Sequence, residues 1–417
     1  MSRIVVTTVG SLGDLHPKIA IALELRRRGH NIVFATQKVY QTKIEALGFE
    51  FHLIHPDAIE DPLEIAKAID LKTGMEYIIR QWLLANLRET YTELMDITKS
   101  ADFLIAGELV YAARLVAEKL GIRWASSALV PMSFFSAYDP PIIASSPLLG
   151  KLRPLGVTVN RGVVNLAKLV TKSWTKPIHQ LRKELGLPKL AGNPLIDDKF
   201  SPYLVLAMFS SVLAKPQPDW ANNTVVTGFT FDDRDLDKAE LTPELQQFLN
   251  AGDPPIVFTL GSVAVLNPGT FYQESIKAAT QLNRRAVLLI GKNSLRDRPP
   301  KDIIALDYAP YSKIFPHACA IVHQGGIGTI AQALKASCPT LIVPYIGDQP
   351  DNAARVKRLK ISRTIVRDKY SASRITKELS ELLGNSSYAT KAARIGEIVR
   401  AENGVKTACD AIERKLK

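Results

Sequence analysis

The run CAIVHQGGIGTIAQALK, residues 319–335, places a histidine, three glycines and a threonine between an apolar run and a helical pattern. This order predicts a buried strand, a loop, and a helix that begins near Thr329. Glycines let a ligand approach the backbone, and the free N–H groups at a helix start carry partial positive charge. We therefore expect a diphosphate at this loop, contacted by His323 and Thr329. A glycine-rich turn made only for packing fits the spacing equally well.

A second polar pair, Asp348 and Gln349, follows the apolar run TLIVPY. Ligands of an open parallel sheet bind at the carboxyl ends of its strands. A carboxylate beside an amide suits the vicinal hydroxyls of a sugar, since the carboxylate accepts hydrogen bonds and the amide both donates and accepts. Taken alone, Asp-Gln-Pro is better explained as a turn with a solvated carboxylate. After the glycine loop, the pair predicts a site for an activated sugar.

The N-terminal run TTVGSLGDLHP holds a carboxylate, Asp14, and an imidazole, His16. Gly10 and Gly13 permit a tight turn, and Pro17 suits an early helical position. Asp14 has two interpretations, an N-cap worth ~1 kcal/mol or a general base facing a cleft, and the spacing alone favours the cap. His16 is the competing base because an imidazole titrates near neutrality. Two residues further along a helix, however, it would face another direction.

The elements that position these residues alternate between short β-rich runs and helical patterns, which predicts βαβ units and parallel sheets. The strand-like runs are RIVVTTV, NIVFAT, DFLIAG and RWASSALV, and then PPIVFTLGS, RAVLLIG, DIIALDY, CAIVHQGG and TLIVPY. A chain of 417 residues exceeds what one core usually organises. We expect an α/β fold of two Rossmann-like domains, residues 1–230 and 256–417, joined by a linker at 231–255. The last helix could return to the first domain.

Cysteine usage and charge exclude several other classes. Cys319, Cys338 and Cys409 lie far apart, so neither a disulfide framework nor a zinc site is expected. No apolar run reaches the ~18 residues of a membrane span, and no leader precedes RIVVTTVG, which predicts a cytoplasmic protein. The net charge of +12 favours an anionic partner. Charge alone does not predict nucleic-acid binding.

The order and spacing of these motifs, over almost the full chain, resemble the UDP-dependent glycosyltransferases of glycosyltransferase family 1. The likeness is greatest to the bacterial branch with macrolide, glycopeptide and sterol-type glycosyltransferases. It implies the GT-B fold, in which two Rossmann-like domains face each other across a cleft, the first binding the acceptor and the second the nucleotide sugar. The donor-binding residues that it implies are Ser11, Gly13, Ser262, Tyr308, Tyr311, His323, Gly325, Gly326, Gly328, Thr329, Asp348 and Gln349.

The resemblance also assigns roles within the donor site. Tyr308 takes the position of the aromatic residue that stacks on uracil, with Tyr311 near the base and Ser262 near the phosphates. Plant members carry a glutamate that binds the ribose where this chain has Ala331. A thymidine-linked sugar is therefore as acceptable as a uridine-linked one, with UDP-glucose as the first candidate.

The N-terminal loop GSLGD is similar to the GSRGD-type loop whose aspartate is the base of the bacterial branch. This reverses the interpretation of Asp14, which becomes the base of an inverting displacement that needs neither metal nor cofactor, with His16 as the alternative. A buried cleft beside a diphosphate would raise the pKa of this carboxyl. Glu108 lies near a family aspartate that assists a histidine base, and we expect no such role here. Asp233 and Asp235, a DxD-like pair, are interpreted as a solvated loop.

The acceptor is expected to be an apolar small molecule or lipid bound by the first domain. The candidate acceptor-binding residues are Met75, Trp82, Met132, Phe134 and Phe135, although such residues are often plain core. Residues 151–183 contain basic side chains and Trp174 but no acidic residue. This segment is either an anionic-membrane contact or a solvated helix face.

Three other functions are weighed against sugar transfer. A nucleotide-sugar epimerase of the same fold is the nearest rival, and a non-catalytic partner of another glycosyltransferase is the next. The second would need neither Asp14 nor the GDQ turn. An NAD-dependent oxidoreductase is disfavoured because neither glycine-rich turn has G-x-G-x-x-G followed by an acidic residue at the end of a second strand.

Overall fold

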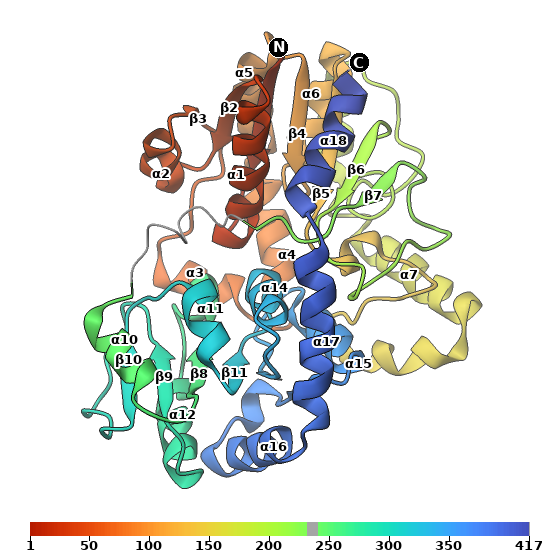
Figure 1. Ribbon diagram of the computed structural model, residues 1–417. Helices are drawn as coiled ribbons and strands as arrows, with labels where there is room; N and C mark the ends of the chain where they lie inside the picture. Colours follow the sequence, from red (N-terminus) through yellow and green to blue (C-terminus); the bar gives the residue numbers. More distant parts are fainter. Residues whose placement is uncertain (232–240, 417) are drawn as a thin grey trace. The chain divides into compact units, whose positions relative to one another are not determined.

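Two α/β units make up the protein, shown as a computed structural model in Figure 1. The structure describes residues 1–231 and 241–416. Unit 1 comprises Met1–Phe231 and Asn403–Lys417, and unit 2 comprises Asp232–Glu402. Each unit holds one parallel sheet, which confirms the predicted fold class of two Rossmann-like domains. None of the described helices is long and apolar enough to cross a membrane.

The sheet of unit 1 has seven parallel strands in the order β3-β2-β1-β4-β5-β6-β7. Their bounds are β1 Arg3–Thr8, β2 Asn31–Thr36, β3 Glu50–Leu53, β4 Phe103–Gly107, β5 Arg123–Ala128, β6 Leu204–Ala207 and β7 Thr224–Val226. The strand order reverses between the neighbours β1 and β4, whose register pairs Thr7 with Ala106. Ligands of doubly wound sheets bind at such a reversal, outside the carboxyl ends of the strands.

The sheet of unit 2 has six parallel strands in the order β10-β9-β8-β11-β12-β13. Their bounds are β8 Ile256–Thr259, β9 Ala286–Leu289, β10 Ile303–Leu306, β11 Ala320–His323, β12 Thr340–Ile342 and β13 Ser362–Thr364. The order reverses between β8 and β11, and His323 of β11 pairs with Thr259 of β8 at the carboxyl edge. The reversal in unit 2 therefore lies at the predicted glycine loop.

Helices cover both faces of each sheet, and this explains the near-continuous apolar character of the inner strands, such as IVFT in β8. In unit 1 the helices are α1 Leu12–Arg27, α2 Gln41–Ala46, α3 Pro62–Ala68, α4 Gly74–Tyr77, α5 Leu87–Thr98, α6 Ala112–Leu120, α7 Val157–Thr171, α8 Lys176–Glu184 and α18 Gly404–Leu416. Unit 1 also has the short turns η1 Lys38–Tyr40, η2 Ile78–Leu83, η3 Pro131–Phe134 and η4 Pro147–Leu155.

In unit 2 the helices are α10 Pro243–Asn250, α11 Gly261–Ala264, α12 Phe271–Gln281, α13 Tyr311–Ile314, α14 Ile327–Lys335, α15 Gln349–Arg358, α16 Ala372–Gly384 and α17 Ser387–Ala401, with η5 Phe315–His317 and η6 Arg367–Lys369. Helix α10 falls inside the range 231–255 that the sequence assigns to a linker. Its Leu245 and Leu249 are buried in the core of unit 2, so this part of the range belongs to the folded unit.

The C-terminal helix α18 belongs to unit 1, although the range 256–417 places it in the second domain. It packs on α1, which runs beside it in Figure 1. The guanidinium of Arg28, at the end of α1, pairs with Asp410 at 2.6 Å and with Glu413 at 2.7 Å. It also pairs with Glu24 of α1 at 2.8 Å. This shared guanidinium is a polar clamp between the two ends of the chain.

Replacing the clamp residue should loosen α18. We expect Arg28→Ala to lower the free energy of unfolding by about 1–3 kcal/mol, because three carboxylates lose one poorly exposed cation. Arg27→Ala is the matched control, since the Arg27 side chain is 74% exposed and, among the described residues, pairs with Glu24 alone. Urea unfolding and amide hydrogen exchange of α18 provide the measurement. Equal effects of the two substitutions would contradict the clamp.

Candidate functional site

The glycine loop of unit 2 is organised by His323, the last residue of β11. Its imidazole is fully buried, and Nδ1 accepts a hydrogen bond from the Gly325 N–H at 3.0 Å. Burial lowers the pKa of His323 to about 3, so the ring is neutral and the proton resides on Nε2. Nε2 is buried, with no hydrogen-bond partner among the described residues. The loop therefore presents one unused N–H donor.

Helix α14 begins directly after this donor. Its N-cap is Gly326, and no side chain caps its first N–H groups. Gly325 has a φ of +94°, and a Cβ there would lie 2.9 Å from Cγ2 of Ile342, so the loop requires glycine at this position. Gly328 has open space around it. Uncapped N–H groups beside the His323 donor form an arrangement suited to a phosphate.

Two polar side chains behind the loop hold it in place. Gln324, not singled out in the sequence, is 6% exposed and donates from Nε2 to Thr329 Oγ1 at 3.4 Å. Thr329 is itself buried in the first turn of α14. The structure thus brings His323, the three glycines and Thr329 together, as the sequence predicts.

The turn after β12 carries Asp348 and Gln349, and their side chains make different hydrogen bonds. Asp348 is the N-cap residue of α15, and its Oδ2 accepts from Asn352 at 2.5 Å. The Oε1 atom of Gln349 accepts from the backbone N–H groups of Tyr345 and Ile346 at 2.7 and 3.1 Å. The amide nitrogen of Gln349 remains as its binding group.

Asn352 joins the turn to the glycine loop and is a residue that the sequence interpretation missed. It is fully buried, and its Nδ2 also donates to the Gly325 carbonyl at 3.1 Å. Its position one helical turn after Asp348 is the signal that could have found it, because residues four apart share a helix face. Asn352 therefore joins the glycine loop and the turn after β12 into one hydrogen-bonded unit.

The remaining donor candidates of unit 2 lie nearby with different exposures. Tyr308 is 77% exposed, as a stacking platform for a base needs to be. Tyr311 instead stacks on Phe315 and shares a 2.8 Å hydrogen bond with Thr259, so it is mainly a packing residue. Ser262 is exposed in α11, and Ala331 is buried in α14.

In unit 1, Ser11 rather than Asp14 is the N-cap of α1, so the cap interpretation of Asp14 is wrong. The helix begins at Leu12, earlier than expected, and Asp14 is its third residue. Asp14 Oδ2 accepts from the Ser11 N–H at 2.8 Å and from its hydroxyl at 3.1 Å, while Ser11 Oγ accepts from Gly13 at 3.2 Å. Gly10 has a φ of +125°, and a Cβ there would meet Asp14 Oδ2. Ser11 and Gly13, expected to touch the donor, thus have a capping role in unit 1.

Burial raises the pKa of Asp14, opposed by the Ser11 hydrogen bonds and by the charge of Lys18. Lys18, one turn further along α1, is 1% exposed, and its Nζ has no hydrogen-bond partner in the described ranges. Burial lowers the pKa of Lys18 to about 8. The carboxyl of Asp14 is therefore more basic than an exposed aspartate and faces a buried cation that the sequence interpretation overlooked.

The two other N-terminal candidates differ from Asp14. His16 lies two residues later within α1, which separates the directions of the two side chains by over half a turn. Glu108, which follows β4, accepts from Ser133 at 2.8 Å and from Lys199 at 3.1 Å. Glu108 is thus already paired with Ser133 and Lys199.

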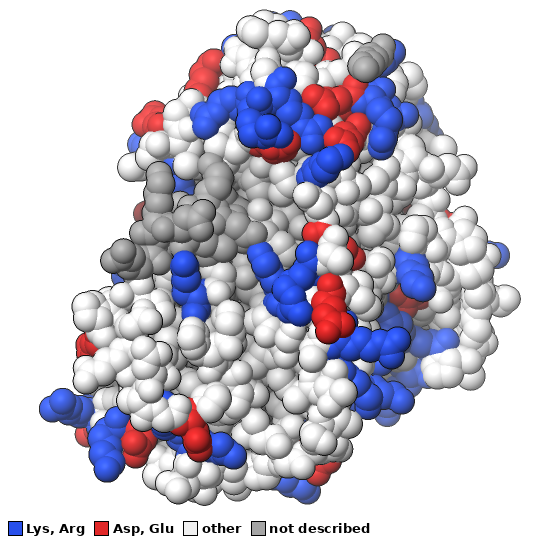
Figure 2. Space-filling view, in the orientation of Figure 1, with Lys and Arg blue, Asp and Glu red and all other residues white. Residues whose placement is uncertain are grey.

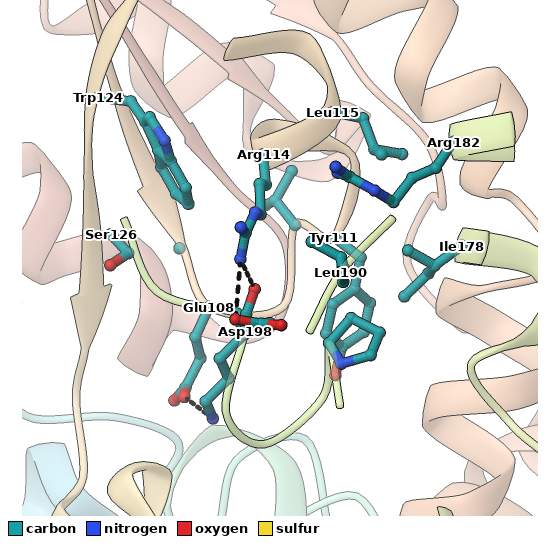
Figure 3. A pocket seen from close by; sticks show the side chains of 14 residues that line it. Glu108, Tyr111, Arg114, Leu115, Trp124, Ser126, Ile178, Arg182, Leu190 and Asp198 are labelled. Carbon is teal, nitrogen blue, oxygen red and sulfur yellow. Dashed lines mark hydrogen bonds and ion pairs between the residues drawn. The ribbon is translucent and has the colours of Figure 1, made fainter. Parts of the chain in front are cut away.

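A pocket of unit 1 lies beside Glu108 at the ends of β4 and β5, and its side chains are drawn in Figure 3. Polar groups in it pair with one another, including Glu108 with Lys199 and Arg114 with Asp198. A second, more apolar pocket contains His55 and Leu109.

None of the five predicted acceptor residues lines either pocket. Phe134 is 8% exposed and stacks on Trp220 at 3.9 Å and on Phe200 at 5.0 Å, so it belongs to the core rather than to a binding surface. Trp82 is part-buried and donates to the Asp57 carbonyl. Met132 and Phe135 are part-buried, and Met75 is 44% exposed.

Potential metal ligands gather elsewhere in unit 1. Among the described residues, His55, Glu89 and Glu93 bring their ligand atoms within 4.8 Å of one another. The His55 ring pairs with Glu93 at 2.7 Å, and this hydrogen bond raises the pKa of His55. The ion pair between His55 and Glu93 is thus sufficient to explain why these side chains lie close together. Asp233 and Asp235 lie outside the described residues.

Comparisons with known proteins agree with this geometry. Residues 4–135 match the glycosyltransferase family 28 N-terminal domain, and residues 274–408 match the erythromycin biosynthesis protein CIII-like C-terminal domain. The O-mycaminosyltylonolide 6-deoxyallosyltransferase of Streptomyces fradiae is 30% identical over 99% of this chain and 97% of its own. A sterol 3-beta-glucosyltransferase of Neurospora crassa is 29% identical over 99% of this chain, which spans 27% of that protein.

Solved structures show the same fold. The glycotransferase of kitacinnamycin superposes with a TM-score of 0.76 at 21% identity, covering 100% of this chain and 99% of that one. The spinosyn rhamnosyltransferase SpnG complexed with thymidine diphosphate has a TM-score of 0.68 at 15% identity, covering 99% and 100%. Both likenesses concern the fold.

The neutral state of His323 makes a testable contribution to stability. Its pKa of about 3 lies below the value near 6.5 of an unfolded chain, so stability is complete above pH 6.5 and is lost as the pH falls towards 3. At pH 5 the wild type should have lost about 2 kcal/mol through this residue. His323→Gln should remove that loss, and His317→Gln, at an exposed position, should not. Urea unfolding at pH 7 and pH 5 checks this, and equal pH dependence of all three proteins would contradict it.

Proposed function

The chain belongs to the family 1-type glycosyltransferases with the GT-B fold, and we propose that it moves a sugar from a UDP- or TDP-linked donor to a hydroxyl of an apolar small molecule or lipid. The proposed transfer is inverting and metal-independent. The single observation that carries the donor assignment is the buried, unpartnered Nε2–H of His323 beside the uncapped start of α14. A buried donor without a partner costs free energy, and a phosphate oxygen would remove that cost.

The diphosphate is proposed to lie against the first turn of α14. Its negative charge complements the helix terminus, and the neutral His323 donates one hydrogen bond without competing for a proton. These donors also stabilise the charge that grows on the diphosphate as it leaves, which is where transition-state stabilisation acts. In this proposal the departing charge is taken up by the protein rather than by a bound cation.

The sugar is proposed to lie against the turn at Asp348 and Gln349. Because Oε1 of Gln349 already accepts two backbone N–H groups, its amide nitrogen donates to one hydroxyl while Asp348 accepts from another. The relative named as a sterol 3-beta-glucosyltransferase supports glucose, and the one named as a deoxyallosyltransferase supports a deoxysugar. Glucose remains our first candidate. Ala331 has no side-chain group that could hydrogen-bond to the ribose hydroxyls, so both UDP- and TDP-linked sugars are proposed as donors.

Asp14 is the proposed general base. It would take the proton of the acceptor hydroxyl, whose oxygen attacks the anomeric carbon as the nucleoside diphosphate leaves, so the configuration inverts. Burial makes this carboxyl a better base, and Ser11 fixes its orientation through two hydrogen bonds. Apolar acceptors are supported by the sterol named for one relative. A cytoplasmic location, with residues 151–183 against an anionic membrane, belongs to the same proposal.

Nucleotide binding tests the donor half of the proposal. UDP or TDP, and their sugars, should raise the melting temperature in a thermal-shift assay, whereas NAD should not. His323→Ala should weaken TDP or UDP binding by about 10- to 100-fold, the value of one lost hydrogen bond to a charged group. His317→Ala provides the matched control for histidine removal. Indifference to all the nucleotides would overturn the donor site.

Substitution of the base tests the catalytic half. Asp14→Asn retains an oxygen for the Ser11 hydrogen bonds but cannot take a proton. We expect it to lower kcat by about 10²- to 10⁴-fold and to leave nucleotide affinity unchanged. The raised pKa of Asp14 also predicts that wild-type kcat/KM falls with decreasing pH well before an exposed aspartate would titrate. His16→Gln should be close to wild type, and the reverse ranking would move the base to His16.

A further inference from the structure

Helix α7 of unit 1 carries exposed apolar side chains on the face opposite its buried residues. Its inner face carries the buried residues Asn160 and Val164. Val159, Leu166, Leu169 and Val170 are instead exposed, at 39%, 49%, 68% and 59%. At 100° per residue these four side chains lie within about one third of the helix circumference, opposite Val164. The helix is therefore apolar on the outside as well as on the inside.

The adjoining turn η4 extends this surface. It packs against α7, and its Leu148 and Leu155 are 70% and 62% exposed. We call the six side chains of η4 and α7 the α7 apolar surface: Leu148, Leu155, Val159, Leu166, Leu169 and Val170. Figure 2 shows largely uncharged atoms where Figure 1 draws helix α7. A cluster of this kind on one face is unusual for a surface that remains in water.

The unpaired charges on the segment that carries the α7 apolar surface are all basic. No acidic residue occurs between Asp139 and Glu184 in the sequence. Three of the basic residues in this stretch pair with carboxylates: Arg153 with Asp139 at 3.0 Å, Lys168 with Asp197 at 2.8 Å, and Arg182 with Glu118 at 2.7 Å. The exposed cations that pair with no carboxylate in the described part of the chain are Lys151, Arg161, Lys172, Lys176 and Lys183.

We propose that the α7 apolar surface docks on an anionic lipid bilayer, with Leu166, Leu169 and Val170 inserted at the boundary between headgroups and acyl chains, an inference that rests on the membrane contact included in the proposed function. The exposed leucines match the acyl-chain region of such a bilayer, and the unpaired lysines match its anionic headgroups. The helix would lie in the plane of the membrane, so its length need not match a membrane span. Docking would hold unit 1 where a lipid-soluble acceptor is concentrated.

Vesicle flotation of the full chain, without nucleotide, tests the proposal independently of sugar transfer. The probes are vesicles of phosphatidylcholine alone and of phosphatidylcholine with phosphatidylglycerol in equal parts. We expect binding to the anionic vesicles at low salt, at least about 10-fold weaker binding to the neutral ones, and weakening by salt. Leu166→Ser/Leu169→Ser/Val170→Ser should lower anionic-vesicle binding by about 10-fold or more.

Control variants test whether vesicle binding depends on the α7 apolar surface or on the overall number of exposed apolar and basic residues. Val39→Ser/Leu63→Ser/Ile398→Ser removes three exposed apolar residues elsewhere and should bind like wild type. Lys172→Glu/Lys176→Glu should abolish the preference for anionic vesicles, whereas Lys301→Glu/Lys377→Glu should not. Circular dichroism and nucleotide binding confirm that each variant is folded.

Two outcomes would overturn the proposal. One is that wild type and the triple α7 variant bind anionic vesicles equally, or that neither binds. The other is that light scattering shows a wild-type dimer that the triple α7 variant loses, because the α7 apolar surface would then be an interface between two copies of the chain. A loss of vesicle binding with sugar transfer from a water-soluble acceptor intact would support docking and leave the proposed chemistry untouched.

Discussion

The hydrogen bond from the Gly325 N–H to Nδ1 of His323 is the interaction on which the donor site of unit 2 depends. It requires a left-handed glycine, fixes the imidazole tautomer, and turns Nε2–H into an unused donor at the end of β11. The same glycine supplies the carbonyl that Asn352 binds, so the loop is tied to the turn after β12. The two backbone groups of this one glycine thus orient the His323 donor and hold the turn after β12 beside the loop.

In unit 1 the loop after β1 is held by the capping box of α1, whereas in unit 2 the loop after β11 is held by the buried imidazole of His323. Both sites follow from sheet topology, because the strand order reverses beside β1 in unit 1 and beside β11 in unit 2. In unit 1 the Ser11 capping box holds the Asp14 carboxylate, and the Gly10 backbone is fixed by Gln37 and Tyr40. The sequence offers the N-cap and the proposed base as alternatives for Asp14, whereas the structure assigns the N-cap to Ser11 and places Asp14 in the same capping box.

Most of the inner strands were predicted from their apolar runs, and the glycine loop from its three closely spaced glycines. The strands β3, β6, β7 and β13 were not predicted. EFHL, TVV and SRT are brief and only part-buried at the sheet edges, whereas LVLA of β6 is buried but only four residues long. Helix α18 could not be assigned to unit 1 from its own residues, because the clamp on Arg28 joins positions nearly four hundred residues apart. Phe134 was misassigned for the same reason: its partner Trp220 is distant in sequence.

A motif therefore identifies residues, whereas the structure shows which atoms of those residues remain free to bind. Gln349 uses Oε1 to hold the backbone of its own turn, and Ser11 uses its hydroxyl to cap α1. Because these atoms already form hydrogen bonds that hold the fold, a ligand can bind only the remaining polar atoms of the same side chains. On that criterion the Nε2–H of His323 and the amide nitrogen of Gln349 are two side-chain donors of the described part of unit 2 that remain for recognition. Lys18 meets the same criterion in unit 1 as a buried ammonium near Asp14, a position where charge adjusts the base without touching the acceptor.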